Sequence, residues 1–146
     1  MEPTIPENGQ YAIFDRFSYR IKDKPFCKGD VVIAVCPTDP NRRICKRIEG
    51  VEKDIVCVSH HHHPFPLVTE VPAGHVYLCG DNPGNSTDSR NYGPVPTDLL
   101  LGKLLWRFNA DSLRFEGIPD KPQVEKDPYQ LMLEQRAVAE FHASRA

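Results

Sequence analysis

The chain has 146 residues, of which 40% are hydrophobic and 26% are charged, and its formal net charge is -2. This composition is typical of one soluble globular domain and gives no support to a polyanionic partner such as nucleic acid. No apolar run approaches the roughly 20 residues of a membrane-spanning helix. Fourteen prolines argue against a helix bundle and favour short strands joined by stiff loops.

Apolar and β-branched runs predict a series of strands along the chain. Short apolar alternation marks residues 11–14, and the turn at Gly29 and Asp30 precedes an apolar run over residues 31–35. Further strands are expected over residues 44–48, 54–58, 75–79 and 99–108, with a turn over residues 49–53. The last of these strands is expected in the core, together with Trp106. The fold class is therefore predicted to be mainly β.

The C-terminal end of the chain has a different composition. Residues 117–128 hold three prolines among charged residues, which is typical of a linker. Residues 129–145 favour a helix, but its apolar stripe is loose, so a docked helix and a frayed extension both fit the sequence. We therefore divide the chain into a domain over residues 1–116 and a proline-rich linker with a helical tail over residues 117–146, and we expect the domain to fold without the tail.

The cysteines and histidines give weak signals. The five cysteines show no CxxC spacing, which argues against a zinc knuckle, and their odd number leaves at least one thiol free. Several lie in apolar segments, where a buried thiol is the simplest interpretation. The four histidines His60, His61, His62 and His63 have the composition of a metal-binding tract. Their position between a predicted strand and a Pro-Phe-Pro segment favours a solvated loop instead, so no metal site is predicted.

Residues 80–93 form the most specific polar segment of the chain. They contain two carboxylates, two serines, an arginine and three glycines in fourteen positions. Glycines let the backbone turn sharply, while neighbouring polar side chains hold one another in fixed positions. A polar functional site is therefore predicted in this segment.

Lys46 lies within the apolar strand predicted over residues 44–48. One interpretation is an outward-facing lysine on a half-buried strand. The other is a desolvated lysine with a lowered pKa, which can act as a general base near neutral pH. Strand alternation places Lys46 on the same face as Ile44 and Ile48, and these apolar neighbours favour the second interpretation.

Several short motifs in this order resemble those of the signal peptidase family. They are Gly29-Asp30-Val31-Val32, Lys46-Arg47-Ile48 with Gly50 and Asp54, Val71-Pro72-Ala73-Gly74-His75-Val76, Gly80-Asp81-Asn82, Asn85-Ser86, Asp88-Ser89-Arg90 and Tyr92-Gly93. The amino-acid sequence of residues 85–96 most resembles the mitochondrial inner membrane protease branch of the family, of the subunit 1 type. The resemblance covers residues 1 to about 108, and the tail has no counterpart in it.

The resemblance implies a serine protease with a Ser-Lys dyad in an antiparallel β catalytic domain. It implies that Lys46 is the general base and that the Ser86 hydroxyl orients the lysine. Asp88 and Arg90 match a structural ion pair beneath the site, on one strand face or in a turn, while Asp81 and Asn82 match the turn that shapes the site. No metal or organic cofactor is implied, and no substrate-binding residue is assigned.

The chain departs from the family pattern at three places. Lys53 stands where the family usually has a glycine, which is unfavourable for a tight turn because lysine tolerates positive φ poorly. Glu49 stands where an apolar residue is usual. The family's nucleophilic serine immediately precedes a Met-x-Pro-Thr segment, and this chain begins Met1-Glu2-Pro3-Thr4. The resemblance therefore implies an N-terminally truncated chain, in which the serine and an upstream membrane anchor precede Met1. Thr4 cannot replace that serine, because a catalytic threonine must be the first residue.

The implied function is removal of targeting presequences from proteins imported into the mitochondrial inner membrane or intermembrane space. The implied location is the intermembrane-space side of that membrane, and the implied partner is a second, related protease subunit. Without its nucleophile, this chain of 146 residues is expected to be inactive. The alternative is a non-catalytic subunit that keeps the protease fold. A self-cleaving repressor-type domain also uses serine and lysine, but the Asp88-Ser89-Arg90 motif disfavours it.

Overall fold

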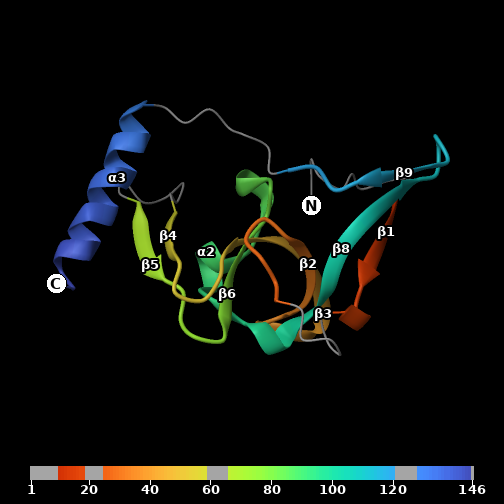
Figure 1. Cartoon of the computed structure of the whole chain (residues 1–146), viewed down its shortest axis with the longest axis horizontal. Coiled ribbons are helices and arrows are strands. Elements are labelled where there is room, and N and C mark those ends of the chain that lie inside the picture. Colours follow the sequence, from red (N-terminus) through yellow and green to blue (C-terminus); the bar gives the residue numbers. More distant parts are fainter. Residues whose placement is uncertain (1–9, 19–24, 59–65, 121–127, 146) are drawn as a thin grey trace.

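The structure is a computed structural model that describes residues 10–18, 25–58, 66–120 and 128–145. The elements in chain order are β1 (Gln10–Asp15), β2 (Val31–Cys36), β3 (Asp39–Gly50), β4 (Ile55–Val58), β5 (Leu67–Glu70), β6 (His75–Cys79), the 3-10 turn η1 (Pro83–Asn85), α2 (Ser89–Tyr92), β7 (Val95–Pro96), the 3-10 turn η2 (Thr97–Leu99), β8 (Leu100–Asn109), β9 (Arg114–Gly117) and α3 (Pro128–Ala143). Figure 1 shows a bent sheet in the centre, the small β4–β5 sheet beside it, and α3 on the outer side of β5.

The large sheet has seven strands in the order β1-β8-β2-β3-β6-β7, with β9 also paired to β8. All its paired strands are antiparallel. The long strand β8 joins β1 to the rest of the sheet, because it pairs with β1 along one edge and with β2 and then β9 along the other. The predicted mainly β, antiparallel fold class with a C-terminal helix is therefore confirmed.

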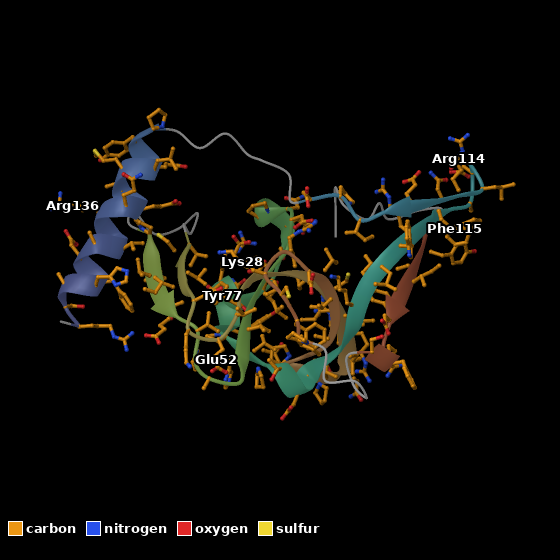
Figure 2. All side chains as sticks on the ribbon, in the orientation of Figure 1. Lys28, Glu52, Tyr77, Arg114, Phe115 and Arg136 are labelled. Carbon is orange, nitrogen blue, oxygen red and sulfur yellow. The ribbon has the colours of Figure 1, made fainter. Side chains whose placement is uncertain are left out.

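Strand β6 separates two apolar clusters, because alternate side chains of a strand point to opposite faces. Val76 and Leu78 belong to the cluster inside the bent sheet, together with residues of β2, β3 and β8. Tyr77 and Cys79 pack on the other side against β4. Figure 2 shows Tyr77 in the middle of the molecule, between the small sheet and the bent sheet. Burial on both faces fixes β6 firmly, and β6 carries the chain directly to Gly80.

Every strand predicted from residue 31 onward is present, but β3 begins five residues earlier and ends two residues later than expected. The predicted core position of Trp106 is wrong. Trp106 is 50% exposed, whereas Leu104 is 2% exposed. Ile13 pairs with Trp106 and Phe14 with Leu104, so a β-bulge leaves Leu105 without a cross-strand partner. The bulge breaks the alternation, and the end of β8 beyond it is covered by no second layer of described residues. In Figure 2 this end of β8 and its partner β9, with Phe115, project away from the body.

The turn before β4 closes although a lysine occupies the position where a glycine was expected. Lys53 adopts a φ of 69°, in the left-handed region. The backbone N–H of Lys53 donates to the Val71 carbonyl at 2.9 Å, and the Asp54 carboxylate accepts from the backbone N–H of Val51 at 3.0 Å. These hydrogen bonds hold the turn in spite of the unfavourable φ.

The C-terminal helix docks on the small sheet, so the frayed alternative is wrong. Leu133, Ala137 and Phe141 of α3 face Pro66 and Val68 across a shallow groove. After the helix, Arg145 forms an ion pair with Glu70 of β5. In the described parts of the chain, no helix has the length and apolarity needed to cross a membrane.

Candidate active site

Strand β3 and the segment after β6 bring Lys46 and Ser86 together. The Lys46 Nζ donates to the Ser86 Oγ at 2.6 Å, across 40 positions in the sequence. Lys46 is half-buried, and Ile44 and Ile48 on the same strand face are both buried. The lysine therefore points toward the polar segment, and the interpretation as an outward-facing surface lysine is wrong.

The Ser86 hydroxyl donates one hydrogen bond and accepts another, and the donor and acceptor roles are fixed. The hydroxyl donates to the Asp88 Oδ2 at 2.7 Å. Because this hydroxyl has only one proton, its oxygen is left to accept from Lys46. In this chain of hydrogen bonds Lys46 donates to Ser86, and Ser86 donates to Asp88. One N–H of the lysine therefore has a fixed direction, and the nitrogen lone pair of a neutral lysine stays available to accept a proton from another group.

Asp88 is the most highly coordinated side chain of the site. It is fully buried and accepts from the Arg90 Nε at 2.8 Å, from the Arg90 Nη2 at 2.5 Å and from the backbone N–H of Gly80 at 2.8 Å. Burial alone raises the pKa of Asp88, but the hydrogen bonds from Arg90, Gly80 and Ser86 together hold it below its ordinary value. The expected pairing of Asp88 with Arg90 is confirmed, and Asp88 caps α2, so the pair lies in a turn.

Gly80 provides the space in which Lys46 and Ser86 meet. A Cβ atom at this position would lie 2.2 Å from the Ser86 Oγ and 3.3 Å from the Lys46 Nζ. No side chain fits there without moving the serine. The sequence showed a glycine at the start of the polar segment, but not that it faces the lysine.

The surroundings of Lys46 favour its neutral form. Burial is the main cause that lowers the pKa of this lysine; Asp88 acts in the opposite direction, and the charges of Arg90 and Arg42 lower the pKa further. An amine with a lowered pKa is deprotonated in a larger fraction of molecules at a given pH. The site can therefore present a proton acceptor with a fixed orientation.

Asp81 serves the site indirectly, through a partner that sequence reasoning missed. The Arg47 Nε and Nη2 donate to the two Asp81 carboxylate oxygens at 3.0 and 2.9 Å. Arg47 is 3% exposed and also donates to the backbone carbonyls of Gly29 and Pro119. The pair ties β3 to the base of the polar segment, on the face of β3 opposite Lys46. Strand alternation had placed Arg47 on that face, but nothing local pointed to Asp81.

The remaining predicted residues lie apart from this network. Asn82 precedes η1 and makes no side-chain capping hydrogen bond, although its carbonyl accepts from the Asn85 backbone at 3.2 Å. Ser89, which was given no role of its own, is buried and accepts from the Leu78 backbone at 2.9 Å. None of the five cysteines, all of which lie in the described part of the chain, forms a disulfide bond, and Cys36 and Cys79 are buried. Thr4 and residues 60–63 lie outside the described residues.

The family model for signal peptidase, peptidase S26, matches residues 1–63 and 58–109. The chain belongs to this family. Mitochondrial inner membrane protease subunit 1 of Xenopus tropicalis is 45% identical over 107 residues, which cover 73% of this chain and 62% of that protein. Mitochondrial inner membrane protease subunit 2 of Danio rerio is 28% identical over 113 residues, covering 73% and 59%.

A crystal structure of a signal peptidase I from Enterococcus faecalis V583 is 19% identical to this peptidase S26 chain and has a TM-score of 0.48. The match covers 56% of this chain and 97% of that one. The likeness is too distant to support an argument about the site. This peptidase S26 chain spans about 62% of the length of the Xenopus relative.

Proposed function

We propose that this protein is a serine endopeptidase of the Ser-Lys type, in which Lys46 is the general base and Ser86 orients it. The observation that carries the proposal is the 2.6 Å hydrogen bond from the Lys46 Nζ to the Ser86 Oγ, beside a buried and fully bonded Asp88. A surface lysine would have neither the lowered pKa nor the fixed partner.

In the proposed mechanism a serine directly before Met1, where the family places its nucleophile, attacks the scissile carbonyl. Neutral Lys46 accepts the hydroxyl proton as the oxygen–carbon bond forms, and later gives that proton to the leaving amine. Water then hydrolyses the acyl-enzyme by the same proton transfers. Asp88 stays ionised throughout, because Arg90 compensates its charge.

The open edge of β3 supports binding of an extended peptide. Residues 43–47 of β3 pair with β2 on one side, but β6 pairs with β3 only from Arg47 onward. Among the described strands, residues 43–46 therefore have no partner on their second side. Backbone groups on a free strand edge can add a peptide as a further strand, which would bring its backbone past Lys46.

The names of the relatives support a more specific proposal for the cellular location, the substrates and the partner of this protein. We propose that the protein acts at the mitochondrial inner membrane, on its intermembrane-space side, and removes targeting presequences from imported proteins. The similarity to both subunit 1 and subunit 2 of mitochondrial inner membrane proteases supports a second, related subunit as its partner. An N-terminal membrane anchor, and a domain over residues 1–116 that folds without the helical tail over residues 117–146, are parts of the same proposal.

The test compares two lysine substitutions in a chain extended through the encoded residues upstream of Met1, including the serine. We expect Lys46→Met to lower the turnover of a presequence peptide by about 10⁴–10⁶-fold. Lys53→Met, at an exposed turn, is the matched control and should keep full turnover. Residues 1–146 alone should not cleave the peptide.

Three outcomes would contradict parts of this proposal. Full activity of the Lys46→Met variant would remove the lysine from the mechanism. Cleavage by residues 1–146 would mean that another hydroxyl is the nucleophile. A folded, extended chain without any activity would favour the non-catalytic subunit instead.

A further inference from the structure

The outer end of the large sheet has one apolar face and one polar face. Residues 10–13, 106–109 and 114–117 pair in a regular antiparallel register, because the β-bulge between β1 and β8 comes only after Ile13. In such a register, directly paired residues share a face, and so do alternate residues of one strand. One face therefore carries five large apolar side chains, and we call it the aromatic sheet face: Tyr11, Ile13, Trp106, Phe108 and Phe115.

Contacts between side chains agree with this assignment of faces. The ring centroid of Phe108 lies 6.3 Å from that of Tyr11 and 5.0 Å from that of Phe115. On the opposite face, Arg107 forms an ion pair with Glu116 at 2.7 Å. The contacts between neighbouring rings restrict their movement, so a partner that binds this face would have less side-chain entropy to overcome.

The aromatic sheet face is exposed as one continuous surface. Tyr11 is 67% exposed, Phe115 64%, Trp106 50% and Ile13 41%. Together these residues expose about 500 Å², since a large aromatic side chain has about 150–250 Å² of surface. Single exposed apolar residues are common, but a contiguous apolar patch of several hundred Å² typically marks an interaction site.

The charges at this end of the sheet all lie on the other face. Residues 10–13, 106–109 and 114–117 contain three charged side chains, and the register places all of them opposite the aromatic sheet face: Arg107, Arg114 and Glu116. Figure 2 shows Arg114 and Phe115 on opposite sides of β9. In a symmetric contact a surface meets its own copy, so a charged face would repel itself. No such repulsion arises here.

We propose that the aromatic sheet face binds the same face of a second copy of this chain and forms a symmetric dimer. Two sheets can stack face to face with their apolar side chains interdigitated between them. The two copies would bury about 1,000 Å² in total, which is the lower limit for a specific interface and implies a weak dimer. The inference does not rest on the proposed protease activity.

The test uses the chain of 146 residues and follows its association in two ways. Sedimentation velocity over about 5–500 μM protein should show a shift from monomer to dimer, with a dissociation constant on the order of 10–500 μM. Trp106 is the single tryptophan of the chain and lies on the proposed interface. Its fluorescence emission should therefore shift to shorter wavelength over the same concentration range, because dimer formation removes the indole from water.

Three matched substitutions locate the contact. Phe115→Glu and Tyr11→Glu each introduce a charge that would be buried next to its own copy, so each should weaken association by at least about ten-fold. Met132→Glu is the control, because Met132 is 53% exposed on α3 and the added charge is the same. This variant should associate like the wild type. Far-UV circular dichroism verifies that each variant is folded.

The wild-type measurements alone can overturn the inference, so it stays testable even if the glutamate variants fail to fold. A monomer at every concentration would overturn it, and so would association without a shift of the Trp106 emission. An equal loss of association in Met132→Glu would also contradict it. If the monomer binds phosphatidylcholine vesicles or a chain related to subunit 2 instead, and Phe115→Glu abolishes that binding, the face has another occupant and the inference is wrong.

Discussion

Two arginine–carboxylate pairs in this chain have the same chemistry but different surroundings. Asp88 and Arg90, beside the candidate active site, have side chains that are 0% and 12% exposed. Glu140 and Arg136, on α3, have side chains that are 67% and 75% exposed. A buried carboxylate that loses its partner is left uncompensated, whereas an exposed one is solvated by water. Burial, and not the presence of the pair, therefore decides what each pair contributes to stability.

The largest effect is expected from Arg90→Ala, which leaves the Asp88 carboxylate buried without its main partner. We expect the free energy of unfolding to fall by about 3 kcal/mol, the lower end for a buried pair because Arg90 is slightly exposed. Urea unfolding measures this change. Arg136→Ala is the matched control on α3 and should cost less than about 0.5 kcal/mol. Equal losses in the two variants would show that burial does not separate these pairs.

Gly80→Ala should have the next largest effect, because the added methyl group would overlap the Ser86 hydroxyl. Moving Ser86 breaks its contacts with Lys46 and Asp88, and overpacking of this kind costs about 1–3 kcal/mol. Gly84→Ala is the control, since the nearest atom to its added Cβ would be the Asn82 Oδ1 at 3.7 Å. Thermal unfolding and turnover should both distinguish the two variants. If Gly80→Ala behaves like the control, the close approach at Gly80 is not needed.

Two truncations that differ by three residues test how far the site depends on the tail. A chain that ends at Asp120 keeps the Pro119 carbonyl that accepts from Arg47 at 3.1 Å, and a chain that ends at Gly117 does not. Both lack α3. We expect both to fold, with the shorter chain less stable by about 1.5 kcal/mol because a hydrogen bond from a charged group is lost. Identical denaturant midpoints would show the Pro119 contact to be superficial, and an unfolded longer chain would mean that α3 completes the fold.

The smallest effect is expected in the pH dependence of stability. Burial lowers the pKa of Lys46, so between this lowered pKa and the ordinary value of about 10.4 the unfolded chain binds more protons than the folded one. Stability contributed by this group therefore rises with pH across that window. Burial raises the pKa of Tyr77 and Tyr92, which act in the opposite direction at alkaline pH.

The difference between wild type and Lys46→Met isolates the lysine from these tyrosines. Urea unfolding from pH 7 to 9.5 should show the wild type gaining stability relative to the variant as the pH rises. A constant difference across this range would mean that the lysine titrates alike in the folded and unfolded chains.

The strands that the sequence predicted are those with continuous apolar or β-branched runs. β2, β4 and β6 bury alternate or successive side chains, so their burial is visible in the residues themselves. β9 was missed because it is short, ends in glycine and is largely exposed. It forms because β8 extends beyond β2 and offers a free edge, which is a property of the assembled sheet.

The candidate site was also predicted only where neighbouring residues form a recognisable pattern, and not where it depends on contacts of the assembled fold. Lys46, Ser86, Asp88 and Arg90 were found from motif spacing and from the resemblance to a family, and the structure brings all four together, although their catalytic roles stay a proposal. Arg47 and its contact with Asp81 span 34 positions, and no local pattern encodes that contact. The exposure of Trp106 depends on a bulge that alternation does not reveal.

The closure of β8 on β1 has a consequence for how the chain folds. Gln10 pairs with Asn109, so the sheet that holds the site is completed by residues from opposite ends of the peptidase domain. Contacts of such large sequence separation must overcome the entropy of closing a long loop, and folds rich in them form slowly. Until β8 has been synthesised, β1 and β2 have no strand to join them. A nascent chain would therefore complete this sheet only late, after synthesis had passed β8.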